Sequence, residues 1–280
     1  MKVVLIILSK TNTDAIYKMN CKCISTFIES ARFANVNFEI LLVESYITQN
    51  YKYKYPNFKI ITPNLPFNFH QFLNIGIKKT YGDFYVLSNN DVIFSKNWLR
   101  VLLDVSKTYS FIESFSPYDS ASNKLSKDII LNNEYVCGYE IQKHITGWCL
   151  VLKKKVINTI GKLDERFDFY YADFDYSMQL QKYNIKHALL TKAIVNHIES
   201  VSYSQENDIN YAELPIETPK YLIKENWTWV LKDKKMLEGV IKFHKKWGSR
   251  RSIKLKLYMT NLLNKAGLGF FSRFVLISKS

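Results

Sequence analysis

The chain has 280 residues, of which 47% are hydrophobic and 15% aromatic, so it can bury a full core and is not intrinsically disordered. Its 9 Gly and 6 Pro are too few for a collagen-like or turn-dense all-β protein. The formal net charge is +14. The longest apolar run near the start, Val3 to Leu8, is too short to span a bilayer or to form a signal peptide. We therefore expect a folded, cytoplasmic protein.

The positive charge is concentrated at the C-terminal end. From Lys220 to Ser280 there are 15 basic and 3 acidic residues, which account for +12 of the total. One interpretation is a nucleic-acid- or polyanion-binding protein. Binding of nucleic acid is not expected, however, because such proteins spread basic residues and stacking aromatic residues over one face, whereas here the basic residues gather in a tail.

Hydrophobic patterning predicts the elements of the fold. Continuous β-branched and aliphatic runs are typical of buried strands, and apolar residues three and four apart are typical of helices. The expected elements, in chain order, are a strand over 2–8, a helix over 20–34, strands over 38–43 and 58–61, a helix over 70–79, a strand over 83–87, a helix over 98–107, ordered chain over 147–151, helices over 154–160 and 176–183, and a strand over 187–195. The polar segment 114–133 is expected to be an irregular loop.

This alternation predicts an α/β fold with a doubly wound, mostly parallel sheet flanked by helices. The expected first domain covers 1–210, divided near residue 107 into an ordered first half and a looser second half over 108–210. Residues 211–280 are expected to form a basic, helical C-terminal extension. The four cysteines, at positions 21, 23, 137 and 149, lack the spacing of a metal ribbon or a disulfide scaffold, so they are expected to be free thiols.

Two acidic clusters follow predicted strands, where ligands bind in sheets of this kind. Asp91 ends the run Asn89-Asn90-Asp91, and its carboxylate could hold Mn²⁺ or Mg²⁺ together with phosphate oxygens. The second cluster runs from Asp164 to Asp175 and is followed by His197. One of its carboxylates could act as a general base, with His197 as a metal ligand. An Asp at such a turn also fits a simple helix cap.

Six short motifs occur in a fixed order along the chain. They are Pro66-Phe67-Asn68-Phe69 with Asn74 and Gly76, Gly82–Leu87 with Asn89–Val92, Gly147 with Gly161–Phe167, Tyr170–Asp175, His197, and Lys246-Trp247-Gly248. In this order and spacing the chain resembles the inverting glycosyltransferases of family 2, which have the GT-A fold. The resemblance extends from Lys2 to about Ser204, with a further fragment at 243–248.

The resemblance implies a metal-dependent enzyme that moves a sugar from a nucleoside-diphosphate sugar to a hydroxyl of a glycan or lipid-linked glycan. Asp173 would be the general base of a single displacement that inverts the anomeric carbon. Asp91 and His197 would hold Mn²⁺ or Mg²⁺ at the diphosphate of the donor. The expected domain 1–210 would then be the catalytic domain, with a nucleotide-sugar half over 1–107 and an acceptor half over 108–210. The Lys-, Asn- and Ile-rich composition separately indicates synthesis of a cell-surface polysaccharide.

The same resemblance implies the binding residues. Those expected near the donor nucleotide are Ser9, Thr11, Glu44, Asn68, Asn74, Asn89 and Asn90. Those expected near the acceptor are Trp148, Asp164 and Glu165. From the residues alone, Trp148 fits a core position equally well, and Asp164 and Glu165 also fit a helix cap.

The chain departs from the family pattern at three positions. Ala172 replaces a Glu, Glu44 replaces an Asp, and Gln179 stands where many members have an Arg, so an ion pair with Asp175 is expected to be missing. The missing carboxylate at position 172 leaves open a catalytically silent relative that only binds sugar nucleotides.

The tail also has alternative interpretations. The basic stretch 242–256 is followed by 257–277, which interleaves Leu, Met, Phe and Val with few charges. This composition is typical of a helix on an anionic membrane, here the inner face of a cell membrane. A helix pair docked on the catalytic domain and a contact in a homodimer are the alternatives.

Overall fold

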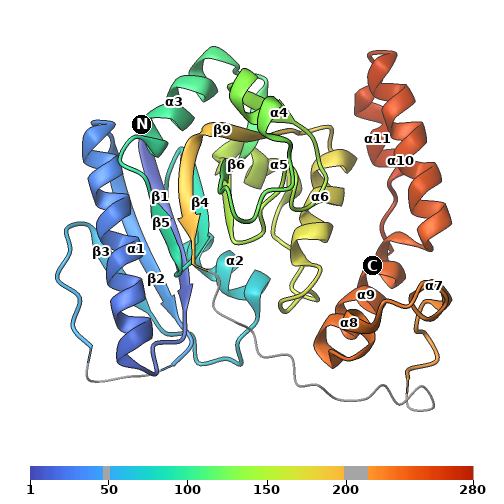
Figure 1. Ribbon diagram of the computed structural model, residues 1–280, viewed down its shortest axis with the longest axis horizontal. Coiled ribbons are helices and arrows are strands. Elements are labelled where there is room, and N and C mark those ends of the chain that lie inside the picture. The colour runs from blue at the N-terminus through green and yellow to red at the C-terminus, as the bar shows by residue number, and fades with distance from the viewer. Residues whose placement is uncertain (47–50, 199–213, 280) are drawn as a thin grey trace.

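The structure is a computed structural model that describes residues 1–46, 51–198 and 214–279 (Figure 1). Its strands are β1 Lys2–Ser9, β2 Asn37–Glu44, β3 Phe58–Ile61, β4 Phe84–Asn89, β5 Val92–Phe94, β6 Ile112–Tyr118, β7 Tyr135–Cys137, β8 Cys149–Lys153 and β9 Lys186–His197. Its helices are α1 Asp14–Phe33, α2 Phe69–Lys79, α3 Trp98–Thr108, α4 Lys127–Asn132, α5 Lys154–Ile160, α6 Ala172–Lys182, α7 Lys220–Lys224, α8 Thr228–Leu231, α9 Lys234–Trp247, α10 Arg250–Lys265 and α11 Ser272–Val275.

One mixed sheet forms the centre of the molecule. Its order is β3-β2-β1-β4-β8-β6-β9-β5, with β7 paired to β9 outside this path. Strands β1 to β4 run parallel to one another, β8 runs antiparallel between β4 and β6, and β6 is parallel to β9. The α/β fold with a largely parallel sheet flanked by helices is therefore confirmed.

Strand β1 shows how the sequence produces the layers. Its residues 3–7 are fully buried, and successive side chains of a strand point to opposite faces. Val3, Leu5 and Ile7 pack with α1 and α3, whereas Val4 and Ile6 pack with α2, α5 and α6. An apolar residue at every position is therefore needed, because helices cover both faces of the sheet.

The prediction of an irregular loop over 114–133 was wrong, because this segment contains most of β6 and all of α4. Polar residues of β6 are buried but have partners. The hydroxyl of Ser114 lies 2.7 Å from both the Tyr176 hydroxyl and Nδ1 of His187. Pro117 lies at a shift in the register between β6 and β9, a place where a strand tolerates proline.

Two helices begin earlier than predicted. Helix α1 begins at Asp14 instead of residue 20, because the Thr13 hydroxyl accepts a hydrogen bond from the Ile16 amide and caps the first turn. Helix α6 begins at Ala172 instead of residue 176, so Asp173 lies within its first turn. This early start places Asp173 on a rigid element.

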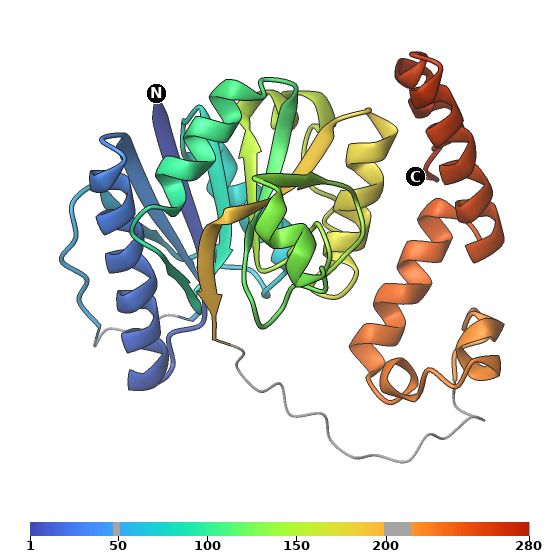
Figure 2. The same ribbon diagram turned by 45° about the horizontal axis from the view of Figure 1, so that its top comes forward.

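The predicted helical C-terminal extension is present. Helices α7 to α11 form a column beside α6 (Figure 2), and both α9 and α11 contact α6. The indole of Trp247 is fully buried in a cluster with Phe167 and Met178. Within the described ranges, no helix is both long enough and apolar enough to cross a membrane. The extension therefore packs against α6 and the segment before it through a separate hydrophobic cluster, outside the core of the sheet.

Candidate functional site

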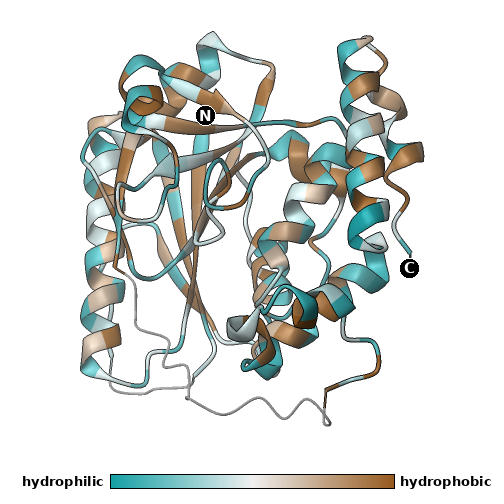
Figure 3. Cartoon of the chain, turned by 45° about the vertical axis from the view of Figure 1, so that its right-hand side comes forward, coloured by the Kyte–Doolittle hydropathy of each residue, from teal (hydrophilic) through white to brown (hydrophobic). Residues whose placement is uncertain are grey.

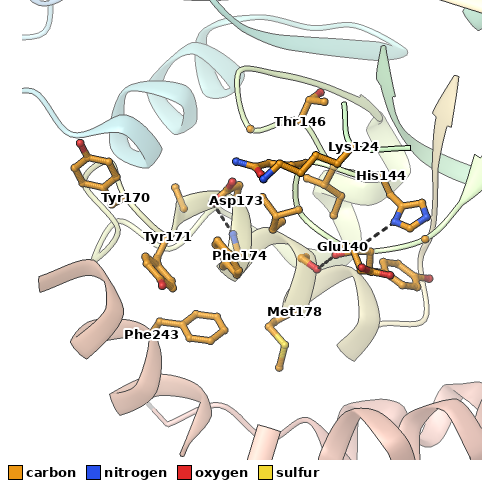
Figure 4. Close-up of a pocket in the computed structure, with 18 of the residues that line it drawn as sticks. Lys124, Glu140, His144, Thr146, Tyr170, Tyr171, Asp173, Phe174, Met178 and Phe243 are labelled. Carbon is orange, nitrogen blue, oxygen red and sulfur yellow. Dashed lines mark hydrogen bonds between the residues drawn. The ribbon is translucent and has the colours of Figure 1, made fainter. Parts of the chain in front are cut away.

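A cavity of about 1500 Å³ lies between the sheet domain and the C-terminal helices. Four residues singled out from the sequence line it: Asn89, Trp148, Asp173 and His197. The segment 137–148 and the first turn of α6 form one wall (Figure 4), and residues of α7 to α10 form part of another. The cavity therefore brings together side chains from both clusters predicted at strand ends.

Asp91 and His197 meet because β5 and β9 pair in antiparallel register, which puts Val92 opposite His197. Nε2 of His197 lies 3.4 Å from Oδ1 of Asp91. The ring of Trp148 stacks on the imidazole, with 4.7 Å between ring centroids and 9° between planes. Trp148 thus fixes the orientation of the histidine as well as lining the cavity.

These two side chains suit a metal ion. Oδ1 of Asp91 and Nδ1 of His197 are buried and have no hydrogen-bond partner among the described residues. Native proteins rarely leave buried polar atoms unpaired, and a carboxylate oxygen with an imidazole nitrogen is a donor set that Mn²⁺ accepts. Within the described ranges, no group of three or more His, Cys, Asp or Glu is arranged to hold a metal ion, so a metal here would need further ligands from a bound phosphate or water.

Asp173 has the properties of a general base. It lies half-buried in the first turn of α6, and its Oδ1 accepts a hydrogen bond of 2.9 Å from the Phe174 amide. Burial raises the pKa of Asp173 from 3.8 to about 6. Gly147 faces it closely, since a Cβ at this glycine would lie 3.1 Å from Oδ2 of Asp173. Any larger residue at position 147 would crowd the carboxylate.

The backbone next to this carboxylate is strained. Tyr171 precedes α6 with a φ of 64°, a left-handed conformation that is unfavourable for a residue with a large side chain. Such strain persists only where surrounding packing holds it, and it is concentrated at functional sites. Here the ring of Tyr171 stacks on Phe174, with centroids 4.6 Å apart. This packing holds the start of α6, and with it Asp173, in place.

Ser9, Thr11 and Glu44 form a buried polar network at the ends of β1 and β2. One oxygen of Glu44 accepts hydrogen bonds from the amides of Thr11 and Tyr46, at 2.9 and 3.0 Å. Its other oxygen accepts from the Thr11 hydroxyl. The Ser9 and Thr11 hydroxyls lie 3.1 Å apart. The carboxylate of Glu44 is therefore already hydrogen-bonded within the protein.

Asn20 and Tyr53 complete this network, and the sequence analysis missed both. The Asn20 amide donates to the hydroxyls of Thr11 and Tyr53, each at 2.8 Å, and its oxygen accepts from Asn90 at 2.8 Å. A signal was present for Asn20, because it lies three residues before Cys23 on the buried face of α1. No comparable pattern marked Tyr53.

Asn68, Asn74, Asp164 and Glu165 lie apart from the cavity lined by Asp173. Asn68 donates to the carbonyl of Glu165 at 2.7 Å. Asn74 donates to Oε1 of Glu165 at 3.0 Å and accepts from the Leu163 amide at 2.9 Å. These contacts tie the segment before α6 to α2. They give the two asparagines a structural role, and contact with donor or acceptor stays a prediction for all four residues.

The expectation that Asp175 lacks an ion pair was wrong. Gln179 supplies no charge, but Nζ of Lys246 in α9 lies 2.6 Å from Asp175 and 2.7 Å from Asp164. The indole of Trp247 also donates to Asp175, at 2.8 Å. A cation for Asp175 is thus supplied by α9 of the C-terminal helices and not by position 179 of α6.

The two carboxylates of this ion pair differ in their electrostatics. Although burial opposes ionisation of Asp164, the side chains of Arg166 and Lys246 hold its pKa well below the usual range. For Asp175, burial outweighs the opposing effect of Lys246 and raises the pKa. This agrees with their exposure, since the side chain of Asp175 is 1% exposed and that of Asp164 is 15% exposed.

No protein-family model and no curated protein matches the chain. Among solved structures, it is similar to the crystal structure of GalNAc-T7 with UDP, GalNAc and Mn²⁺, with a TM-score of 0.59 and 13% sequence identity. The match covers 98% of this chain and 59% of that chain, so the protein spans about three-fifths of the length of the relative. At this identity the similarity establishes the fold alone, and the chain has a GT-A-like fold.

Proposed function

We propose that the protein is an inverting, metal-dependent glycosyltransferase that uses a nucleoside-diphosphate sugar. The observation that carries the proposal is that His197, paired with Asp91, and Asp173 with its raised pKa line the same cavity at the carboxyl edge of the sheet. The similar structure of GalNAc-T7 contains UDP, GalNAc and Mn²⁺. This supports a donor of the same general kind, whose nucleotide and sugar are still to be identified.

In the proposed reaction, Asp173 accepts the proton of an acceptor hydroxyl while the hydroxyl oxygen attacks the anomeric carbon of the donor. The bond between that carbon and the diphosphate oxygen breaks on the opposite side, so the anomeric configuration inverts. With a pKa of about 6, Asp173 is mostly ionised at neutral pH and is a stronger base than an ordinary Asp. A Mn²⁺ or Mg²⁺ ion held by Asp91 and His197 would offset the charge that builds on the diphosphate.

The donor pocket is proposed at the ends of β1, β2 and β4. Ser9, Thr11 and Glu44 form its base, and Asn90 is tied to the same network through Asn20. Asn89, at the end of β4, lines the cavity that contains Asp173. These hydrogen bonds would hold the pocket in shape before a nucleotide binds, which reduces the entropic cost of binding.

The acceptor is proposed to be a glycan, because aromatic side chains of the C-terminal region line the cavity opposite the sheet. Tyr221, Trp227 and Trp229 contribute to this wall, and the two indoles stack with centroids 5.6 Å apart and 21° between planes. The flat apolar faces of aromatic rings can stack on the apolar faces of sugar rings, and the Tyr O–H and Trp N–H groups at their edges can form hydrogen bonds. Trp148 is engaged with His197, so its predicted role in acceptor binding stays a prediction.

A nucleic-acid- or polyanion-binding protein is a weaker explanation of the charge. Several basic residues of the tail already have acidic partners in the protein. Lys246 is buried between two carboxylates, Arg250 pairs with Glu225 at 2.5 Å, and Lys242 pairs with Asp168 at 3.2 Å. Other basic residues of the tail, such as Arg251 and Lys265 on α10, are exposed to solvent.

The proposal is tested by calorimetric titration with UDP, GDP, dTDP and CDP, each with Mn²⁺ and with EDTA. Wild type is compared with Asp91→Asn and with Asp128→Asn, an exposed Asp on α4 that serves as the matched control. We expect metal-dependent binding of one nucleotide that Asp91→Asn abolishes and Asp128→Asn retains. Absence of binding by folded wild type to all four nucleotides, or equal binding by all three proteins, would contradict the proposal.

Turnover then separates an enzyme from a silent relative. The nucleotide that binds is supplied as its sugar conjugates, and release of the free nucleoside diphosphate is followed with oligosaccharide acceptors. The anomeric configuration of the product is read by nuclear magnetic resonance. A product of retained configuration would contradict the role given to Asp173.

A further inference from the structure

The outer face of α10 carries an apolar stripe that no described element covers. Leu255, Tyr258, Met259 and Leu262 follow the i, i+3, i+4, i+7 spacing that puts side chains on one side of a helix. Leu255, Tyr258 and Leu262 are 59%, 62% and 48% exposed. Brown and teal residues alternate along α10 and α11 in Figure 3, as expected for helices with apolar and polar faces. Apolar side chains gathered in this way on a surface mark an interaction site.

The chain that follows α10 adds exposed aromatic rings to the same region. Phe270 and Phe274 are 59% and 58% exposed, and the ring of Phe271 lies 4.0 Å from that of Phe270 between centroids. Helix α11 contacts α10, so these rings belong to one surface with the helix pair. We call the exposed residues of α10 and the following turn the C-terminal face.

Positive charge borders the apolar stripe. Arg251 lies one turn before Leu255 and Lys265 about one turn after Leu262, so both cations share the exposed side of α10. Both are exposed, and neither is within ion-pair distance of a carboxylate in the described part of the chain. From Gly239 to the end, the sequence has 10 Lys and Arg and no Asp or Glu. The C-terminal face is therefore apolar at its centre and cationic at its ends.

We propose that the C-terminal face docks on an anionic lipid bilayer, with the stripe of α10 and the rings after it in the headgroup region. Apolar and aromatic side chains flanked by Lys and Arg are the pattern of a helix that lies in the membrane interface. Anionic headgroups add about 1 kcal/mol for each nearby cation. The face carries no acidic residue to meet these cations in a symmetric dimer, where the same patch would face itself and like charges would repel.

The docked orientation has a consequence for the cavity. Another side of α10 lines the cavity through Ile253 and Leu257, so the helix that rests on lipid also forms a wall of the proposed active site. A lipid-linked acceptor would then reach Asp173 from the bilayer surface. Only this last consequence rests on the proposed glycosyltransferase function; the contact with lipid does not.

Co-sedimentation with vesicles tests the proposal. The full chain is mixed with vesicles of phosphatidylcholine alone or with about 30% phosphatidylglycerol. We expect binding to the anionic vesicles that is at least about tenfold tighter than to the neutral ones, because two or more cations contribute. The variant Leu255→Glu/Leu262→Glu should lose at least about tenfold in affinity for anionic vesicles, since it places two carboxylates in the headgroup region.

The matched control is Leu131→Glu, which changes an exposed leucine of α4 and should bind like wild type. Melting curves establish that all variants are folded. Failure of wild type to bind anionic vesicles, or equal binding by wild type and the double variant, would overturn the proposal. So would a dimer in gel filtration that the double variant converts to monomer without any vesicle binding, because that result assigns the face to self-association. None of these outcomes depends on nucleotide binding.

Discussion

The molecule contains two groups of buried carboxylates that differ in how they are satisfied. Asp164 and Asp175 share Lys246, and Asp175 also accepts from the indole of Trp247. Around the cavity, by contrast, Oδ1 of Asp91 has no hydrogen-bond partner in the described part of the chain, and Asp173 accepts only from backbone. The carboxylates of the first group have a cation and hydrogen-bond donors within the protein. Those of the second group have no cation beside them within the described ranges and can still accept a metal ion or a proton.

This difference separates the acidic residues that stabilise the fold from those that are available for catalysis or metal binding. A buried charge that is paired and hydrogen-bonded is stable, but removal of its partner is strongly destabilising. A carboxylate such as Asp173, whose pKa is raised by burial with no cation beside it among the described residues, lowers stability at neutral pH, and proteins keep such groups mainly at functional sites. Asp173 lies in the same acidic stretch of the sequence as Asp164 and Asp175, so only the groups packed around each carboxylate distinguish them.

The largest expected effect is on turnover. Asp173→Asn keeps the size of the side chain but removes the base, and we expect the rate to fall about 10²–10⁴-fold. Binding of the nucleotide with Mn²⁺ should be unchanged, because Asp173 is not assigned to the donor. Steady-state kinetics with Asp128→Asn as control measures the effect. A variant that retains the wild-type rate would show that another group takes the proton.

The next effect is on stability. Lys246→Met leaves Asp175 buried without its cation, and we expect the free energy of unfolding to fall by about 3–5 kcal/mol. Urea denaturation measures this change. Lys245→Met is the matched control, because the neighbouring Lys245 is exposed and pairs with the exposed Glu217 at 3.2 Å. That variant should lose less than about 1 kcal/mol. Equal losses in the two variants would remove the distinction between the two groups of carboxylates.

The smallest expected effect is an increase in the free energy of unfolding. Because the pKa of Asp173 is raised from 3.8 to about 6, this carboxyl favours folding only while it is protonated, and that contribution is lost as the pH rises through 6. Asp173→Asn should therefore raise the free energy of unfolding at pH 7.5 by about 1–2 kcal/mol, with allowance for solvent access. Below about pH 4 the two proteins should be equally stable. Urea denaturation at both pH values checks this, and a destabilised variant at pH 7.5 would contradict it.

Much of the fold could be predicted because it depends on local patterns. The apolar run of β1 can be buried only if helices cover both faces of its sheet. The spacing of the apolar residues in α1 gives that helix one apolar face, which packs on the sheet. Strand β6 was not predictable in this way, because Ser114 and Ser116 look exposed until Tyr176, His187 and neighbouring backbone satisfy them. Polar residues in a core can be recognised only with their partners.

Some residues of the candidate site were singled out from the sequence, and others were missed. Asp91 and His197 were singled out because polar residues at strand ends meet at one edge of a sheet, whereas Asp173 was singled out through the resemblance to the family 2 glycosyltransferases. The network around Glu44 needed Asn20 and Tyr53, which come from separate segments of the chain. Their roles depend on distances that no pattern of spacing encodes.

By itself, the sequence determined the alternation of strands and helices, the strand ends that carry the carboxylates, and the basic, helical nature of the C-terminal region. These properties follow from side-chain chemistry and periodicity over a few residues. Only the tertiary structure decided that Lys246 pairs with both Asp164 and Asp175, whereas Asp91 and Asp173 stay available. The physical reason is that the cost of a buried charge depends on which groups from distant parts of the chain pack around it.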